Sequence, residues 1–273
     1  MLTEKTINIS PFKKRLPRHN QIDLWLFSVG ILTDALRNEY ENILSGEEHD
    51  FCNKIAIQDK KDLFISSKVL LRKLLYCYTS VPASQWRFAI NSFGRPCISE
   101  PSQYRSVQFN ISHAKGLMAC SISTFHEVGV DVENISRDRD FLGISRAFFC
   151  EREVDSLTSA PSHEVGRMFY TYWTLREAYL KAKGVGLSSP LSSFWFEQVP
   201  FPRICFRHEC KEAGKRWRFV SKRITDEHIL ALAIRANHKA NINVRVYRAQ
   251  DHAGKFRVDR SYNIVSSAHP DVT

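Results

Sequence analysis

Two acidic side chains, Asp131 and Glu133, lie two residues apart in the apolar segment Val128–Glu133. The segment is rich in β-branched residues and is followed by turn-forming residues, which predicts a buried strand. Because side chains alternate along a strand, both carboxylates point to one face, while Val130 and Val132 point to the other. The segment therefore offers two oxygen ligands on one face of a sheet.

A second pair of reactive residues, Glu177 and Lys181, lies further along the chain in a segment with a helical pattern. Residues four apart lie one turn apart, so the two side chains share one side of the helix. Carboxylates from a strand and a helix form an oxygen cage suited to a hard divalent cation, and Mg²⁺ is the expected ion. A lysine beside such a cage can hold a phosphate against the metal.

Each motif also has an ordinary structural interpretation. An Asp-x-Glu pair is typical of the polar face of a half-buried strand. Glu177 and Lys181 are equally typical of a solvent-exposed pair that stabilises a helix by roughly a few tenths of a kcal/mol. The functional interpretation depends on combining these motifs with other segments of the chain.

Composition bounds the class of protein. The chain has 273 residues, of which 43% are hydrophobic, as expected for a globular protein. No apolar run is long enough to span a bilayer, and the basic N-terminal residues are not followed by the apolar segment of a signal peptide. The 7 cysteines are scattered without a C-x-x-C pair, which favours free thiols over a disulfide frame or a zinc site. We therefore expect a cytoplasmic protein.

The net charge of +10 indicates an acidic or phosphorylated partner. Nucleic acid would be one such partner. Lysine and arginine are, however, spread along the whole chain, without a basic tail or an aromatic-basic RNA motif. We therefore expect protein and small-molecule partners, with neither nucleic acid nor membrane.

The local patterns predict a mixture of helices and short strands. Strands are expected at 22–29, 85–90, 107–111, 117–123, 128–133, 203–207, 216–222 and 228–234. Helices are expected at 33–44, closed by Ser45-Gly46, and at 62–78, 135–148 and 164–183, with Gly184 as the last stop. The layout occurs twice, which predicts an α+β fold of two similar halves with a site between them. The expected divisions are 1–126, 127–238 and a C-terminal appendage, 239–273.

Four segments resemble those of the 4′-phosphopantetheinyl transferases of the larger, surfactin-synthetase-activating type. Phe93–Pro96 is similar to the G-K/R-P turn of that family, and Phe109–His113 to its F-N-x-S-H segment. Val128–Glu133 resembles its strand with alternating acids, and Trp173–Lys181 its W-x-x-K-E-x-x-x-K helix. The loop Gly184–Leu187 matches as well. The segments follow the order and spacing of the family.

The resemblance implies a pseudo-dimer of two α+β halves that binds coenzyme A and Mg²⁺ between them. Such an enzyme transfers the phosphopantetheine arm of coenzyme A to a serine of an apo carrier protein and releases adenosine 3′,5′-bisphosphate. Because the fold is internally duplicated, a monomer is expected. The sequence does not say whether the carrier serves fatty acid, polyketide or non-ribosomal peptide synthesis.

Residue roles follow from the same resemblance. The Mg²⁺ ligands would be Asp131, Glu133 and Glu177. The residues that hold coenzyme A would be Lys181 and Ser112 at the pyrophosphate, His113 at the 3′-phosphate, and Phe93, Gly94, Arg95 and Pro96 at the adenine end, with Arg95 as its cation. Glu177, or else Glu133, would accept the serine proton, and Lys181 would stabilise the departing phosphate.

Two features depart from the family pattern. Arg176 stands before the metal glutamate where lysine is common, which keeps the charge but changes the geometry. The basic residues ahead of the second helix that grip the 3′-phosphate have no arginine counterpart in register, so Lys60 or Lys61 is expected to take part. A carrier helix is expected to meet the region 141–157, through Phe148, Phe149 and Val154.

Two other functions fit some of the same residues. A Mg²⁺-dependent phosphohydrolase would use the three carboxylates on coenzyme A or a nucleotide without any carrier protein. A basic nucleic-acid-binding protein would show affinity that falls steeply with salt and does not depend on Asp131.

Overall fold

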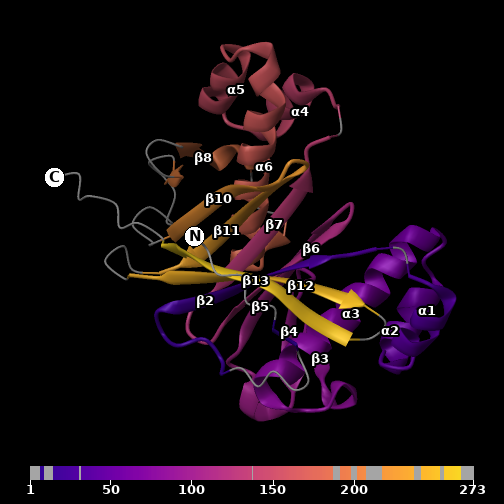
Figure 1. Cartoon of the computed structure of the whole chain (residues 1–273). Helices are drawn as coiled ribbons and strands as arrows, with labels where there is room; N and C mark the ends of the chain where they lie inside the picture. The colour runs from indigo at the N-terminus through magenta and orange to yellow at the C-terminus, as the bar shows by residue number, and fades with distance from the viewer. Residues whose placement is uncertain are drawn as a thin grey trace.

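The computed structural model describes residues 7–8, 15–30, 32–136, 138–186, 191–197, 202–206, 217–236, 241–252 and 255–265. It has the α+β fold expected from the sequence, with two β-sheets that share one core and long helices packed on their outer faces (Figure 1). Within the described residues, no helix is both long and apolar enough to cross a bilayer.

The larger sheet has the strand order β1-β13-β12-β2-β6-β5. Its strands are β1 (Ile7–Asn8), β13 (Lys255–Val265), β12 (Asn243–His252), β2 (Gln21–Ser28), β6 (Leu117–Ser123) and β5 (Gln108–Ala114). β5 runs three residues beyond its predicted end at 111, because its pairing with β6 continues to the turn at Gly116. Ser112 and His113 therefore lie in a strand and point to opposite faces.

The C-terminal strands belong to this larger sheet. β12 lies parallel to β2, with Val244 beside Ile22, and β13 returns antiparallel to β12. Arg245 of β12 donates to Asp23 of β2 at 2.7 Å. The described part of the expected appendage, 239–273, is thus built into the sheet, whereas the expected boundary after residue 126 stays a prediction.

The smaller sheet has the order β10-β11-β7 and is antiparallel throughout. Its strands are β10 (Trp217–Thr225), β11 (His228–Arg235) and β7 (Val128–Asn134). β7 is an edge strand of this sheet, and it lies alongside β5 of the larger sheet. Two hairpins complete the described strands: β3 (Arg87–Ile90) with β4 (Pro96–Glu100), and β8 (Phe194–Glu197) with β9 (Arg203–Phe206).

Six α-helices lie in the described part of the chain: α1 (Asp34–Glu41), α2 (Gly46–Asn53), α3 (Gln58–Thr79), α4 (Phe141–Phe148), α5 (Glu151–Thr158) and α6 (Ser162–Lys183). Thr33 caps α1 and Gly184 ends α6, as predicted. The interpretation of Ser45-Gly46 as a helix end is wrong, because Ser45 begins α2. Its hydroxyl accepts from the Glu48 amide and the Glu48 carboxylate accepts from the Ser45 amide, a capping box.

The element order occurs twice. A first strand (β2) leads to three helices, a two-stranded hairpin and an antiparallel pair (β5, β6), and β7 leads through three helices and a hairpin to β10 and β11. In each copy, the first strand pairs with the last strand of the copy. This repetition is the internal similarity that the sequence layout predicted.

A buried ion pair recurs at the same place in both copies. Glu153, in the capping box of α5, accepts hydrogen bonds from both terminal nitrogens of Arg176 on α6, and both side chains are almost fully buried. Glu48, in the capping box of α2, accepts hydrogen bonds from both terminal nitrogens of Arg72 on α3. Each arginine also lies over a phenylalanine of the following hairpin. Each ion pair therefore ties a short helix to the long helix of its half.

We expect loss of the arginine of the buried pair to be strongly destabilising. Arg176→Met leaves the Glu153 carboxylate buried without its counter-charge, at a cost of about 3–5 kcal/mol in urea denaturation. Adding Glu153→Gln should restore part of that loss, because a neutral amide still accepts from the Phe196 amide. The control is Arg167→Met, which removes an exposed pair with Glu164 and should cost less than about 1 kcal/mol. If the losses of stability caused by Arg176→Met and Glu153→Gln were strictly additive, the proposed coupling between the two buried side chains would be contradicted.

Candidate active site at the junction of the two sheets

The alternation predicted for β7 is present. Val128, Val130 and Val132 lie in the core between the two sheets, whereas the residues between them face α6. Asp131 is only 4% exposed, and Glu133 is partly exposed. The strand therefore holds two carboxylates on the side where α6 crosses it.

The approach of α6 to β7 is set by Gly129. A Cβ at this position would lie 2.1 Å from the carbonyl oxygen of Ala178 and 2.4 Å from the amide nitrogen of Ala182. Both are backbone atoms of α6, which cannot move aside as a flexible side chain can. The absence of a side chain at Gly129 thus lets Glu177 and Lys181 lie beside the acidic face of β7.

Three of the expected site residues form one hydrogen-bonded cluster. The Lys181 ammonium lies 2.6 Å from Asp131 Oδ1 and 3.0 Å from the Ser112 hydroxyl oxygen. Ser112 also donates to Asp131 Oδ1 at 2.8 Å. The other carboxylate oxygen of Asp131, Oδ2, is buried and has no hydrogen-bond partner among the described residues. Residues from β5, β7 and α6 therefore meet around one carboxylate.

Side chains of β5 bind the outer edge of β7. Asn110 Oδ1 accepts from the Val130 amide at 2.9 Å, and the Ser112 hydroxyl accepts from the Val132 amide at 3.3 Å. Asn110 and Ser112 are two residues apart, and so are the amides that they bind. These side chains therefore bind β7 where the backbone of a neighbouring strand would otherwise do so. Local sequence patterns assign Asn110 no role beyond its place in a motif, and only its contact with β7 identifies it.

The turn between β3 and β4 is joined to the C-terminal end of α6. Asn91 accepts from the amides of Phe93 and Arg95, and its own amide donates to the Gly184 carbonyl at 3.0 Å. The Arg95 guanidinium points inward and donates to the Ala182 carbonyl. Burial lowers the pKa of Arg95. The expected role of Arg95 as a cation for the adenine end stays a prediction, and its visible contacts are to the end of α6.

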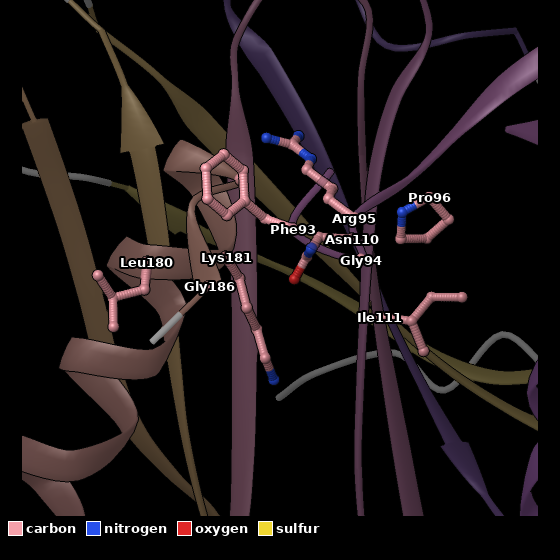
Figure 2. Close-up of a pocket in the computed structure, with 10 residues that line it drawn as sticks. Phe93, Gly94, Arg95, Pro96, Asn110, Ile111, Leu180, Lys181 and Gly186 are labelled. Carbon is pink, nitrogen blue, oxygen red and sulfur yellow. The ribbon is translucent and has the colours of Figure 1, made fainter. Parts of the chain in front are cut away.

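A cavity of about 190 Å³ opens between this turn and α6 (Figure 2). It is lined by the four turn residues Phe93, Gly94, Arg95 and Pro96, by Asn110 and Ile111 of β5, and by Leu180, Lys181, Gly184 and Gly186. The cavity thus unites four of the segments that the sequence singled out.

The remaining expected ligands lie outside the lining of the cavity. His113 follows Ser112 on β5 and points to the other side of the strand; burial, together with the charge of Lys181, lowers its pKa. Lys60 and Lys61 lie in the first turn of α3, where Lys61 is 3.7 Å from Glu41. Arg176 belongs to the ion pair with Glu153, so its departure from the family lysine affects the packing of α5 and α6. The roles of His113, Lys60 and Lys61 stay predictions.

The carboxylates repel one another. Burial, and then the charge of Asp131, raise the pKa of Glu133 and of Glu177, against the attraction of Lys181. Within the described residues, no group of three or more His, Cys, Asp or Glu side chains is arranged as a ready metal site. The buried, unpartnered Oδ2 of Asp131 and the all-oxygen donor set nevertheless suit a hard cation, which would relieve this repulsion.

Comparisons with known proteins match this chain to one family. A family model described as the 4′-phosphopantetheinyl transferase superfamily matches residues 127–233, and one described as 4′-phosphopantetheinyl transferase, N-terminal, matches residues 36–124. A putative 4′-phosphopantetheinyl transferase of Synechocystis sp. is 30% identical over 185 residues, which are 67% of this chain and 73% of that relative. A 4′-phosphopantetheinyl transferase of Nostoc sp. is 30% identical over 145 residues, 53% of this chain.

The match to the Nostoc relative spans 61% of its length, less than two thirds. Among solved structures, the holo-[acyl-carrier-protein] synthase of Thermotoga maritima aligns with 50% of this chain and 84% of that chain, with a TM-score of 0.34 and 15% identity. A likeness at that level adds nothing to the sequence matches.

Adding a methyl group at Gly129 should separate α6 from β7. Gly129→Ala places a Cβ against the backbone of α6, and such overpacking costs about 1–3 kcal/mol or more. We expect a lower midpoint in thermal unfolding. Gly46→Ala is the matched control, since nothing lies within 4 Å of a Cβ there. Equal unfolding midpoints for the two variants would contradict the tight contact.

The raised pKa of Glu177 gives a pH-dependent stability with a definite sign. When the pKa of a carboxyl group is higher in the folded than in the unfolded state, the folded protein is destabilised as pH rises from the usual pKa of the group to its folded pKa. Above the folded pKa this cost stays constant. Without divalent cations, Glu177→Gln should therefore be more stable than the parent at neutral pH, and the difference should disappear on acidification below the usual glutamate range. Thermal unfolding in the presence of a chelator, from neutral to acidic pH, measures this. A variant that is less stable at neutral pH would contradict it.

Proposed function

This chain belongs to the 4′-phosphopantetheinyl transferase superfamily, and from that premise we propose that it transfers the 4′-phosphopantetheine arm of coenzyme A to a serine of an apo carrier protein. The observation that carries the proposal is the cluster of Lys181, Asp131 and Ser112 at the edge of the cavity between the β3–β4 turn and α6. Such a cluster combines a cation for phosphate with carboxylate oxygens for a metal.

In this proposal the pyrophosphate of coenzyme A lies against Lys181. The ammonium has three N–H donors, of which the contacts to Asp131 and Ser112 use two, so one is available to a phosphate oxygen. Mg²⁺ would be held by Asp131, Glu133 and Glu177. It would neutralise negative charge on the oxygens of the phosphoryl group during its transfer. The Phe93–Pro96 turn would hold the adenine end.

Glu177 is the proposed proton acceptor. Burial and the neighbouring charge of Asp131 raise its pKa, which makes it a stronger base than an exposed glutamate. The carrier serine oxygen forms a bond to the β-phosphorus of coenzyme A as its proton passes to Glu177, and the bond from this phosphorus to the bridging oxygen breaks. The released adenosine 3′,5′-bisphosphate retains that oxygen, and Lys181 stabilises its charge.

The proposed carrier surface is on α4 and α5. Of the apolar residues expected to meet a carrier helix, Phe148 is 43% exposed and lies against Trp173, whereas Phe149 is buried in the core. Carrier proteins with acidic helices would be attracted by the net charge of +10, which speeds and orients docking. We place the reaction in the cytoplasm, carried out by a monomer. The free thiols among the described cysteines fit a reducing compartment.

Mass spectrometry of an apo carrier protein incubated with coenzyme A and Mg²⁺ tests the activity. We expect the carrier to gain one phosphopantetheine group with the parent protein. The rate should fall by about 100-fold or more with Glu177→Gln and with Lys181→Ala, because each removes a charged group from the reaction. Glu164→Gln, an exposed glutamate at the start of the same helix, is the matched control and should retain the parent rate.

The same assay without carrier protein separates the alternative enzyme class. Hydrolysis of coenzyme A that does not require a carrier would favour the phosphohydrolase and reject the transferase.

A further inference from the structure

Asn110 combines a fixed orientation with a donor that faces the cavity. The residue is 5% exposed and lines the cavity between the turn and Lys181 (Figure 2). Its Oδ1 accepts from the Val130 amide at 2.9 Å. A backbone N–H can be met only by the oxygen of an amide side chain, so this bond decides which way the Asn110 amide is turned.

The nitrogen of the same amide is therefore left toward the cavity. Asn110 Nδ2 makes no hydrogen bond with the residues that the structure describes. Unlike Asp131 Oδ2, it is not fully buried, so it stays accessible. An atom that is neither bonded nor closed off, on a residue that is otherwise buried, is open to whatever enters the cavity.

Other donors around the cavity already have partners. The Arg95 guanidinium donates to the Ala182 carbonyl and to Gln108 Oε1, and the Ser112 hydroxyl donates to Asp131. Lys181 retains one of its three N–H donors. The side-chain NH2 of Asn110 can thus donate, without rearrangement, to a ligand rich in hydrogen-bond acceptors, such as a nucleoside diphosphate.

We propose that Asn110 is a binding residue whose amide donates to an acceptor on the nucleotide diphosphate part of coenzyme A, while its oxygen holds the backbone of β7 one residue before Asp131. This inference rests on the proposed function, which puts coenzyme A in the cavity. One side chain then connects the position of the substrate to the position of the carboxylate that acts on it. The bound substrate and β7 are held in register through a single amide plane.

The substitution Asn110→Asp separates the two roles. A carboxylate of the same shape still accepts from the Val130 amide but offers an acceptor, with a negative charge, where the donor was. At about pH 8 an aspartate is ionised. Because the position is buried, the new charge lowers the thermal midpoint, so binding is titrated well below that midpoint, where the protein is folded. We expect the dissociation constant for coenzyme A, and for adenosine 3′,5′-bisphosphate, to rise by about tenfold or more in calorimetric titration. In the transfer assay the KM for coenzyme A should rise more than kcat falls.

Two further variants complete the test. Asn110→Ala removes both bonds and should lower the thermal midpoint as well as the affinity. Asn42→Asp adds the same charge at the exposed end of α1 and should leave the dissociation constant unchanged at constant ionic strength.

The outcomes are distinct. Parent-like affinity of the folded Asn110→Asp protein overturns the donor contact, and so does a KM for coenzyme A that stays at the parent value while kcat falls. Failure of the parent protein to bind coenzyme A or to modify any carrier rejects the proposed function itself, whatever the variants do.

Discussion

β7 is an edge strand, and the backbone groups along its outer side need partners that its own sheet does not supply. Asn110 and Ser112 of β5 provide them by accepting from the Val130 and Val132 amides. Because buried amides must be paired, these two side chains fix the register between the two sheets. Asp131 lies between the two bonded amides, so the same constraint that joins the sheets places the central carboxylate of the site.

The long helix α6 is held against β7 from two directions. On the strand side, Gly129 permits contact with the helix backbone, and on the far side the Arg176–Glu153 ion pair ties α6 to α5. The first half repeats the ion pair but not the chemistry. On β2, the side chains that face α3 are Asp23, which accepts from the Tyr78 hydroxyl of α3, and Trp25 and Phe27, which belong to an apolar core. The first half therefore has a single acid on this face, neutralised by Arg245, where β7 has two.

Local patterns predicted much of this arrangement. The alternation of β7, the length of α6 with its stop at Gly184, and the shared side of Glu177 and Lys181 are set by neighbours within one or two turns of the chain. The rest depends on distant partners. The pairing of β12 with β2 joins segments more than 200 residues apart, and no local pattern predicts it. The partner of Arg176 is also distant, a glutamate in the capping box of another helix. Likewise, the inward direction of the Arg95 guanidinium depends on where α6 ends, although its motif was evident.

Glu177 and Lys181 are four residues apart on α6, about 6 Å along the helix axis, so the proposed proton acceptor and its neighbouring cation keep their separation whatever the surrounding loops do. What varies is the position of this pair relative to Asp131, and that position is set by the contact of α6 with β7 at Gly129. The 2.6 Å contact from Lys181 to Asp131 is the direct result of that packing. Because electrostatic stabilisation depends on groups being held in place before the charge develops, the accuracy of such a site derives from one helix–strand contact. In the proposed function, the loops around the cavity therefore bind the substrate and contribute little to the alignment of the charges.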